Sequence, residues 1–481
     1  CSSDLYNIDI IMNKIQYFDI KLAINEKRDI KGIELENKIK IVLVSDPNIN
    51  SSSCSVAVGA GYLQDEFPGS AHFLEHLLFM GNEKYKSRNE YHSYIQINGG
   101  SDNAFTADNL TCYYLNLETS FLKKGIEMLS WFFRAPLLDH TYINSEMDII
   151  NSEHNKNILM DNWIMDDIFK NFIKGDSKYK KFGTGNNISL KNITKDDILK
   201  YYNTHYTTDN ICVCIVDSKN IETMISEYVN YFVDIPMKIT EYEKKSKLEP
   251  IEFIPNDIIY FKSSSEYLFL NFYLIIDVRQ TNTIEYQLAL LINYLLGSEF
   301  IGSIGYFLKE NNIIKNISSS IDYFYDTNAN INLKYVLVNI DENIFAQCYY
   351  STLRYIEKFK KILEEDFIEI YENYRKINML GMLYEPSNDP VSISNNIVEN
   401  LFKSNAENCV IRQYYVYEYS KSIYDKFIEI VSEIQIKITT NINYKKYPEN
   451  KYIQSTWYKS SYIIDYINFK KSNYKLDEYN Y

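Results

Sequence analysis

The chain has 481 residues, a length that fits two to four domains better than a single core of ordinary size. Hydrophobic residues make up 46% of it and charged residues 24%, as in soluble globular proteins, and no apolar run is long enough for a transmembrane helix. The net charge is -14 and no block of Lys or Arg occurs, which argues against nucleic acid as a partner.

The cysteines give a second compositional signal. There are 7 of them, an odd number scattered along the chain, which indicates reduced thiols rather than a disulfide framework. The chain begins with Cys1 and not with Met, so we expect its N-terminus to be incomplete or processed. A signal peptide is therefore neither identified nor excluded, and among compartments the cytoplasm is favoured.

The first part of the chain alternates strand and helix patterns. We expect an entry segment at residues 1–24, a β-hairpin at 33–44, a strand at 55–61 and a helix from Ser70, its predicted N-cap, to about Met80. A second helix at 87–98, paired strands at 102–106 and 111–117, and a helix at 122–133 follow. Gly81 and Gly99 mark the ends of the first two helices.

The first helix carries the pattern H-x-x-E-H. Because positions i and i+4 share one face of a helix, His72 and His76 point at the same spot. Two imidazoles suit zinc, and a neighbouring carboxylate such as Glu75 can act as general base on a water bound to the metal. The order is the inverse of the common H-E-x-x-H metalloprotease motif. Histidine pairs also cap and pack helices, so the five residues alone do not exclude a purely structural role for this pair.

An acidic stretch downstream offers the third ligand. Glu146 and Glu153 are seven residues apart, so both face the same way on a helix. A zinc site with two His ligands needs one more protein ligand and keeps one position for water. We choose Glu153 as that ligand and Glu146 as a carboxylate that orients a ligand or shapes the proton path. The alternative is a solvated acidic helix face.

The order of elements then repeats further along the chain. A glycine-containing loop at 181–186 lacks the spacing of a P-loop, and a helix at 196–205 and a strand at 211–216 follow. Residues 236–255 are charged and flanked by proline, as in a linker. After them the order strand, helix, helix, paired strands, long helix returns over 267–363, which predicts an internal duplication.

The second copy lacks the metal motif. Leu288, Leu291 and Ile292 stand where the motif residues stand in the first copy, and no His follows His205. We therefore expect an α+β protein of two homologous α/β-sandwich domains in tandem, each a sheet packed against helices. The expected domains are 25–235, catalytic and zinc-binding, and 256–481, non-catalytic.

Taken together, these residues resemble the insulysin/pitrilysin metallopeptidases, and in particular the N-terminal half of an insulysin-type chain. The resemblance covers residues 25–460 and is most specific at HFLEH (72–76), GSDNAFT (100–106), NSEHNKN (151–157), Trp163 and KFGTGN (181–186). It implies two insulinase-type domains. It also implies one zinc ion bound by His72, His76 and Glu153.

The resemblance also implies roles for other residues. Glu75 would be the general base, with Glu146 in the supporting acidic position. Asn103 and Ala104 match the edge-strand segment that pairs with extended substrate backbone. The second domain of such enzymes holds the N-terminal end of the substrate, at a strand that here runs through residues 317–320. That strand lacks the glycine-rich character of the family.

The expected function is zinc-dependent hydrolysis of peptides. Enzymes of this type have two halves that close around the substrate, and this chain resembles one half. The expected partners are peptide substrates and a C-terminal half, in the same native chain or as a separate subunit, or a second copy of the chain. Two alternatives stay open: a dimeric enzyme like the processing peptidases, and a catalytically incompetent homologue that binds peptides or serves as a scaffold.

Overall fold

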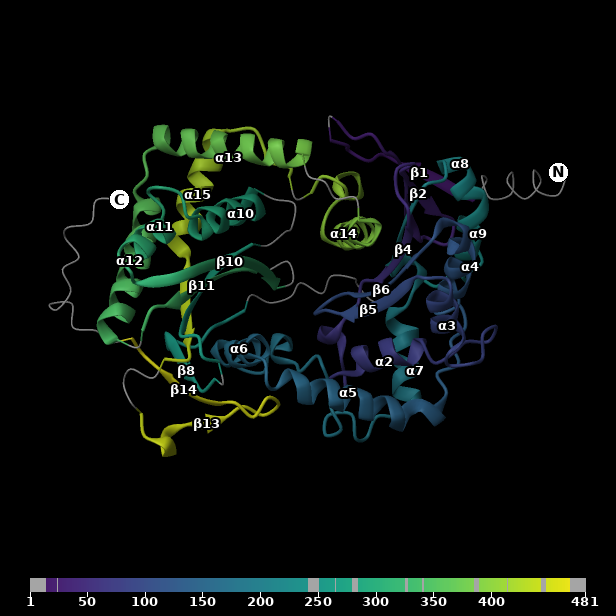
Figure 1. The fold of residues 1–481 in the computed structure, drawn as a ribbon, viewed down its shortest axis with the longest axis horizontal. Helices are drawn as coiled ribbons and strands as arrows, with labels where there is room; N and C mark the ends of the chain where they lie inside the picture. The colour runs from purple at the N-terminus through teal and green to yellow at the C-terminus, as the bar shows by residue number, and fades with distance from the viewer. Residues whose placement is uncertain are drawn as a thin grey trace. The chain divides into compact units, whose positions relative to one another are not determined.

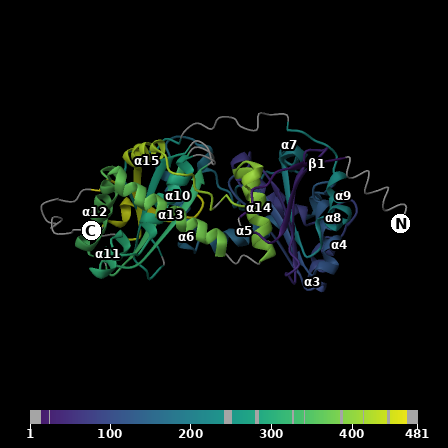
Figure 2. The same cartoon turned by 90° about the horizontal axis from the view of Figure 1, so that it is seen from above.

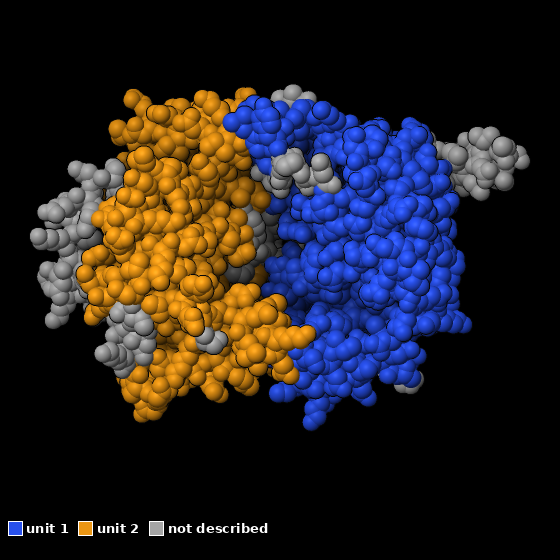
Figure 3. Space-filling view, viewed as in Figure 1, with its two compact units in different colours: residues 1–154, 181–246, 379–415 blue, residues 155–180, 247–378, 416–481 orange. Residues whose placement is uncertain are grey.

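The computed structural model describes residues 14–467, apart from 24, 241–250, 264, 279–283, 325–327, 340, 385–388, 413 and 443–446. They form two compact units, shown in Figure 3. Unit 1 contains residues 1–154, 181–246 and 379–415, and unit 2 contains 155–180, 247–378 and 416–481. Each unit thus includes a segment from the other half of the chain. The domain boundaries predicted from the sequence stay a prediction, and half of the predicted linker, residues 241–250, lies outside the described residues.

Unit 1 is built on a seven-stranded sheet of order β1-β2-β3-β7-β4-β6-β5 (Figure 1). β3 and β7 are parallel and the other neighbouring strands are antiparallel. Fully buried strands lie at its centre, as expected for a sheet covered on both faces. The strands are β1 (Ile15–Phe18), β2 (Asp29–Leu35), β3 (Lys40–Ser45), β4 (Ser52–Val58), β5 (Ser101–Thr106), β6 (Thr111–Leu117) and β7 (Ile211–Asp217).

Helices cover one face of this sheet and enclose the main core of unit 1. Phe73, Leu74 and Leu77 of the motif helix are buried in that core, so the apolar face of the helix holds it against the sheet. The helices are α2 (Ser70–Leu78), α3 (Glu90–Ile97), α4 (Thr119–Ser130), α5 (Ile143–Asn157), α7 (Lys195–His205), α8 (Ile221–Met224), the π-helical turn η6 (Ile225–Val229) and α9 (Asn230–Val233).

The second face of the sheet is covered by α14 (Pro390–Lys403), a helix from far along the chain. Figures 1 and 2 show it lying beside the strands of unit 1. Ile397 and Val398 join an apolar cluster with strand residues there. The Ser394 hydroxyl lies 2.9 Å from that of Ser53 and 2.7 Å from that of Ser55, both on β4. These hydrogen bonds give the buried hydroxyl groups polar partners in place of water.

Unit 2 repeats this strand arrangement, except that its two strands at one edge, β14 and β13, come last in the chain, whereas β1 and β2 come first. Its seven strands lie in the order β10-β11-β9-β12-β8-β14-β13, and β8 and β12 form the parallel pair. The order β9, α10, α11, β10, β11, α12 along the chain repeats the order β4, α2, α3, β5, β6, α4 of unit 1. The strands are β8 (Ile258–Phe261), β9 (Phe269–Asp277), β10 (Ile314–Phe324), β11 (Asn328–Leu337), β12 (Gln435–Thr440), β13 (Ile453–Gln454) and β14 (Ser461–Asp465).

Helices cover both faces of the second sheet as well. The larger core lies under α10 (Ile284–Gly297), α11 (Ile304–Glu310), α12 (Glu342–Lys360), α13 (Glu364–Tyr384) and α15 (Lys421–Glu433). The smaller one lies under α6 (Asp161–Phe169) and the short helix η3 (Lys170–Phe172), which come from the first half of the chain.

The fold predicted from the sequence is confirmed. The class is α+β, with two homologous sheets packed against helices. Leu288, Leu291 and Ile292 are fully buried in the core of unit 2, so the second copy uses the motif positions for packing. The six cysteines in the described part of the chain are buried, and none of them is in a disulfide bond. None of the described helices combines the length and apolarity needed to cross a membrane.

Candidate metal centre

The motif helix α2 presents His72, Glu75 and His76 together. One nitrogen or oxygen from each lies within 4.8 Å of the others. The two imidazole rings are nearly perpendicular, with centroids 4.8 Å apart. Their side chains are 17% and 16% exposed, so a ligand in solution can reach them while most of each ring stays packed.

The start of α2 is fixed by a buried carboxylate. Asp65 accepts hydrogen bonds from the backbone N–H groups of Gly69 (2.7 Å) and Ala71 (2.8 Å) and from the Ser70 hydroxyl (2.9 Å). The N-cap residue is Gly69, with φ 93°, and the expectation of Ser70 at that position was wrong. The Asp65 side chain, which lies before the helix, accepts the hydrogen bonds of N–H groups in the first turn that have no partner within the helix.

Helix α5 brings the predicted third ligand to the same place. Glu153 Oε2 lies 3.5 Å from His72 Nε2, and Glu153 Oε1 lies 3.8 Å from His76 Nε2. The Glu153 side chain is 40% exposed, whereas Glu146, two turns earlier on α5, is 2% exposed. The seven-residue spacing therefore places both carboxylates on the side of α5 that faces α2.

The second ring nitrogen of each histidine has an acceptor. His72 Nδ1 lies 2.7 Å from the carbonyl oxygen of Thr184, and His76 Nδ1 lies 3.4 Å from Glu146 Oε2. An acceptor at Nδ1 places the proton there and leaves the Nε2 lone pair free. Both free lone pairs lie on the side of Glu153. This donor set of two imidazoles and one carboxylate fits zinc.

The charges around the site also favour a cation. Burial lowers the pKa of His76, but the hydrogen bond to Glu146 and the charges of Glu153 and Glu75 outweigh it, so the pKa is held above its ordinary value. Carboxylates that attract a proton to this place attract a divalent cation in the same way.

The two predicted substrate-binding residues lie on β5, the strand at one edge of the sheet. Asn103 is exposed and Ala104 is half-buried against the core of unit 1. The strand pairs with β6 along one side only, in a register that sets Ala104 opposite Tyr113. An edge of this kind can accept an extended peptide as a further strand.

Three groups that contact the site residues were not predicted from the sequence. Thr106, at the end of β5, donates a hydrogen bond of 2.6 Å from Oγ1 to Glu75 Oε2. Arg88 places a guanidinium nitrogen 3.6 Å from Glu146 Oε1. The third is the Thr184 carbonyl, a backbone group without any residue signature. The motif GSDNAFT contains Thr106, but its contact with Glu75 depends on how α2 packs against the sheet, which the motif does not show.

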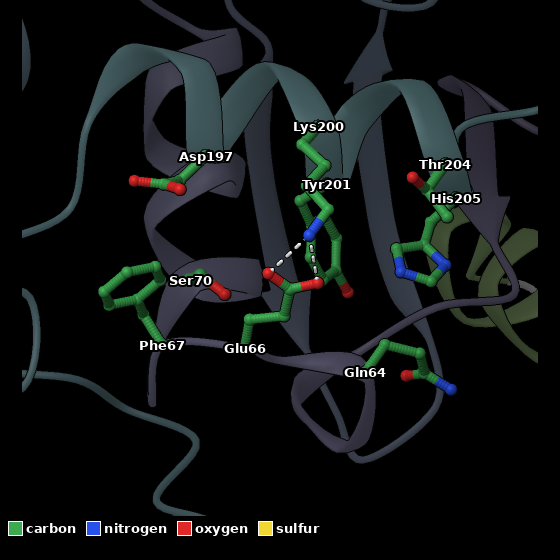
Figure 4. Close-up of a pocket in the computed structure, with 9 residues that line it drawn as sticks. All are labelled: Gln64, Glu66, Phe67, Ser70, Asp197, Lys200, Tyr201, Thr204 and His205. Atoms are coloured by element: carbon green, nitrogen blue, oxygen red, sulfur yellow. Dashed lines mark hydrogen bonds and ion pairs between the residues drawn. The ribbon is translucent and has the colours of Figure 1, made fainter.

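A separate pocket opens near the start of α2 but includes neither predicted histidine ligand (Figure 4). The side chain of Lys200 crosses it to pair with Glu66, with Nζ 2.6 Å from Oε1. The residues that line it are Gln64, Glu66, Phe67, Ser70, Asp197, Lys200, Tyr201, Thr204 and His205.

Comparisons with known proteins agree with this architecture. Residues 40–176 match the family described as insulinase (peptidase family M16), and residues 192–373 match the peptidase M16 inactive domain. The insulin-degrading enzyme of Drosophila melanogaster is 31% identical over 256 residues, 49% of this chain and 26% of that protein. The insulin-degrading enzyme homolog of Dictyostelium discoideum is 30% identical over 357 residues, 71% of this chain and 37% of that protein.

A solved structure shares the fold. Pitrilysin superposes with a TM-score of 0.83 at 20% sequence identity, over 95% of this chain and 49% of its own. Each of these matches spans less than half of the relative's length. The two family models, the relatives and the shared two-sheet fold together show that this chain belongs to the insulinase family of peptidases, family M16.

Proposed function

We propose that the chain is the metal-binding half of a zinc-dependent endopeptidase that hydrolyses peptides. One observation supports this most: α2 and α5 direct His72 Nε2, His76 Nε2 and the Glu153 carboxylate at one point. The adjacent Glu75, 6% exposed, supplies a carboxylate that can take up a proton there. A family relationship alone would not support activity, because family M16 includes an inactive domain.

Zinc held by His72, His76 and Glu153 would act as a Lewis acid that polarises the peptide carbonyl and lowers the pKa of water. Glu75 takes the proton of the attacking water and delivers it to the leaving amine. Glu146 and the Thr184 carbonyl keep the two imidazoles in the tautomer that presents Nε2. The free edge of β5, at Asn103 and Ala104, aligns the extended substrate by backbone pairing.

The proposal includes a partner. This chain matches less than half of the length of its relatives, so we propose that a second half, in the same native chain or as a separate subunit, completes the substrate chamber. A second copy of this chain is the other candidate for that place.

The test is cleavage of an internally quenched fluorescent peptide by the purified chain, alone and with an added insulysin-type C-terminal half. Glu75→Gln is the blank, because it keeps the shape of the side chain and removes the base. We expect chelator-sensitive cleavage by the wild type and nearly none by Glu75→Gln, with equal zinc content in both. Cleavage that survives in Glu75→Gln would overturn the mechanism. Bound zinc without cleavage in every combination would favour a peptide-binding homologue.

Metal analysis after dialysis tests the ligands separately. His72→Gln and Glu153→Gln should each lose zinc. His92→Gln, which removes another imidazole whose side chain is 56% exposed, should retain it. Zinc loss in all three variants, or in none, would contradict the assignment.

A further inference from the structure

Thr106 makes a contact with Glu75 that no role assigned so far explains. Its hydroxyl donates to Glu75 Oε2 over 2.6 Å, a distance in the range of strong hydrogen bonds between a hydroxyl group and a carboxylate. Glu75 itself is 6% exposed, so little water competes for that oxygen. One oxygen of the proposed general base is therefore held by a protein hydroxyl.

The donor is fixed in place by the hairpin that carries it. Thr106 is paired with Thr111 of β6, and the turn after it is closed by a 2.7 Å bond from the Ala107 N–H to the Leu110 carbonyl. A β-branched side chain on a strand has few rotamers, so its hydroxyl direction is set by the backbone. Glu75 is held equally well, because neighbouring residues of α2 are buried in the core.

We propose that Thr106 is the positioning residue of the general base. By occupying Oε2 it fixes the plane of the carboxylate and directs Oε1 to the place where the proton is taken up. This inference rests on the proposed function, since it gives Glu75 the role of base. It concerns the orientation of that base, and it assigns Thr106 no contact with metal or substrate.

The location of Thr106 gives the contact a second consequence. Asn103 and Ala104, the proposed substrate-binding positions, lie three and two residues before it on the same strand. A peptide that adds to the edge of β5 would thus dock on the strand that also holds Glu75. Substrate alignment and base alignment would share one rigid element, which is how positioned catalytic groups gain their rate advantage.

The kinetic test compares Thr106→Val, Thr106→Ser and a matched control. Valine keeps the branched shape without the hydroxyl, and serine restores a hydroxyl. Thr111→Val removes a hydroxyl from the facing residue of the same hairpin, where it bonds to the Ala60 carbonyl over 2.9 Å. We expect Thr106→Val to lower kcat at least about tenfold with KM and zinc content little changed. Thr106→Ser should recover most of kcat, and Thr111→Val should leave kcat near the wild-type value.

A second readout needs neither metal nor activity. In metal-free protein, Thr106→Val should reduce the folding equilibrium constant about tenfold, the value of a hydrogen bond to a charged group. The same change in a Glu75→Ala background should reduce it less than threefold, because the acceptor is gone. Equal effects in both backgrounds would overturn the contact.

The outcomes separate this inference from the proposed function. A wild-type kcat in Thr106→Val, or a serine variant as slow as the valine variant, would overturn the positioning role. Loss of zinc in Thr106→Val would do so too, because it would point to general damage. Undiminished cleavage by Glu75→Gln would instead remove the proposed function, and coupling between Thr106 and Glu75 in the metal-free protein would still show that the contact exists.

Discussion

The Nδ1 atom of His72 lies 2.7 Å from the carbonyl oxygen of Thr184, a residue 112 positions further along the chain. The loop that carries this carbonyl is locked to the start of α2. The Lys181 ammonium donates to the carbonyls of Leu63 and Asp65. Gly185 also lies so close to Gly69 that a Cβ on Gly69 would come within 2.3 Å of the Gly185 Cα. The orientation of one predicted metal ligand thus depends on a distant glycine loop.

This dependence predicts that Gly185→Ala weakens zinc binding. Gly185 has φ +78°, and a Cβ there would lie 3.1 Å from the Gly69 Cα, so the loop has to move and carry the Thr184 carbonyl with it. We expect a loss of about tenfold or more in zinc affinity, as for other groups that orient metal ligands. Gly175→Ala is the control, because Gly175 has φ +69° and open space around it. Competition with a chromophoric chelator measures both, and equal affinities would refute the prediction.

A second prediction concerns Glu146, whose carboxylate orients the other histidine. It is buried and lies between His76 Nδ1 at 3.4 Å and a nitrogen of Arg88 at 3.6 Å. Glu146→Gln keeps the shape and removes the charge that holds the proton on Nδ1. We expect zinc affinity to fall about 10- to 100-fold. Glu127→Gln removes a carboxylate paired with Lys84 and Lys124 away from the site, and it should keep wild-type affinity. A wild-type dissociation constant in Glu146→Gln would contradict the prediction.

The order of elements could be predicted from the sequence, and so could the helix faces that carry the residues of the candidate site. His72 and His76, and likewise Glu146 and Glu153, could be placed on helix faces because helical spacing is a local property. The contacts of Thr106 and Thr184 could not be, because pairing across a sheet or a loop brings together residues distant in sequence. The wrong N-cap at Ser70 has a local cause: Asp65, five residues earlier in the preceding loop, accepts the hydrogen bonds at the start of the helix, and the chain enters the helix through Gly69.

The covering helices are a further part that local patterns do not reveal. Helix α14 is amphipathic, but nothing in its sequence says that it packs on the sheet of unit 1 and not on the sheet of unit 2. The strand β1 lies within the predicted entry segment and is identified only by its pairing with β2. An element of this kind packs where a sheet still has an apolar face to be covered. That depends on the fold of the whole chain and not on the local sequence.

The position of α14 predicts a third outcome. Ile397 is 4% exposed and packs in the apolar cluster on the second face of the sheet in unit 1. Ile397→Ala should lower the free energy of unfolding by about 2 to 4 kcal/mol, through lost burial and the cavity left behind. Asn396→Ala changes the neighbouring exposed residue of the same helix and should stay within about 0.5 kcal/mol. Urea unfolding measures both, and similar values for the two variants would show that α14 contributes little to stability.

The fourth prediction is an acid sensitivity that arises at His205. This imidazole lines the pocket of Figure 4 and packs on Tyr201, with ring centroids 4.5 Å apart. Burial lowers its pKa to about 4, with a smaller lowering by Lys181 and an opposing effect of Glu66. In the unfolded chain the pKa is about 6.5, so on acidification the unfolded state binds the proton first. The stability that the neutral ring provides is complete above about pH 6.5 and is lost as the pH falls toward 4.

His205→Gln, which cannot titrate, should therefore lose less stability on acidification than the wild type. Between pH 7.5 and pH 5 we expect a difference of about 1 to 2 kcal/mol, reduced from the full linkage value because the ring is partly exposed. Comparing the two chains cancels the titration of the many carboxylates they share. Urea unfolding at the two pH values gives the answer, and parallel pH dependences for wild type and His205→Gln would show that His205 stays accessible to protons in the folded state.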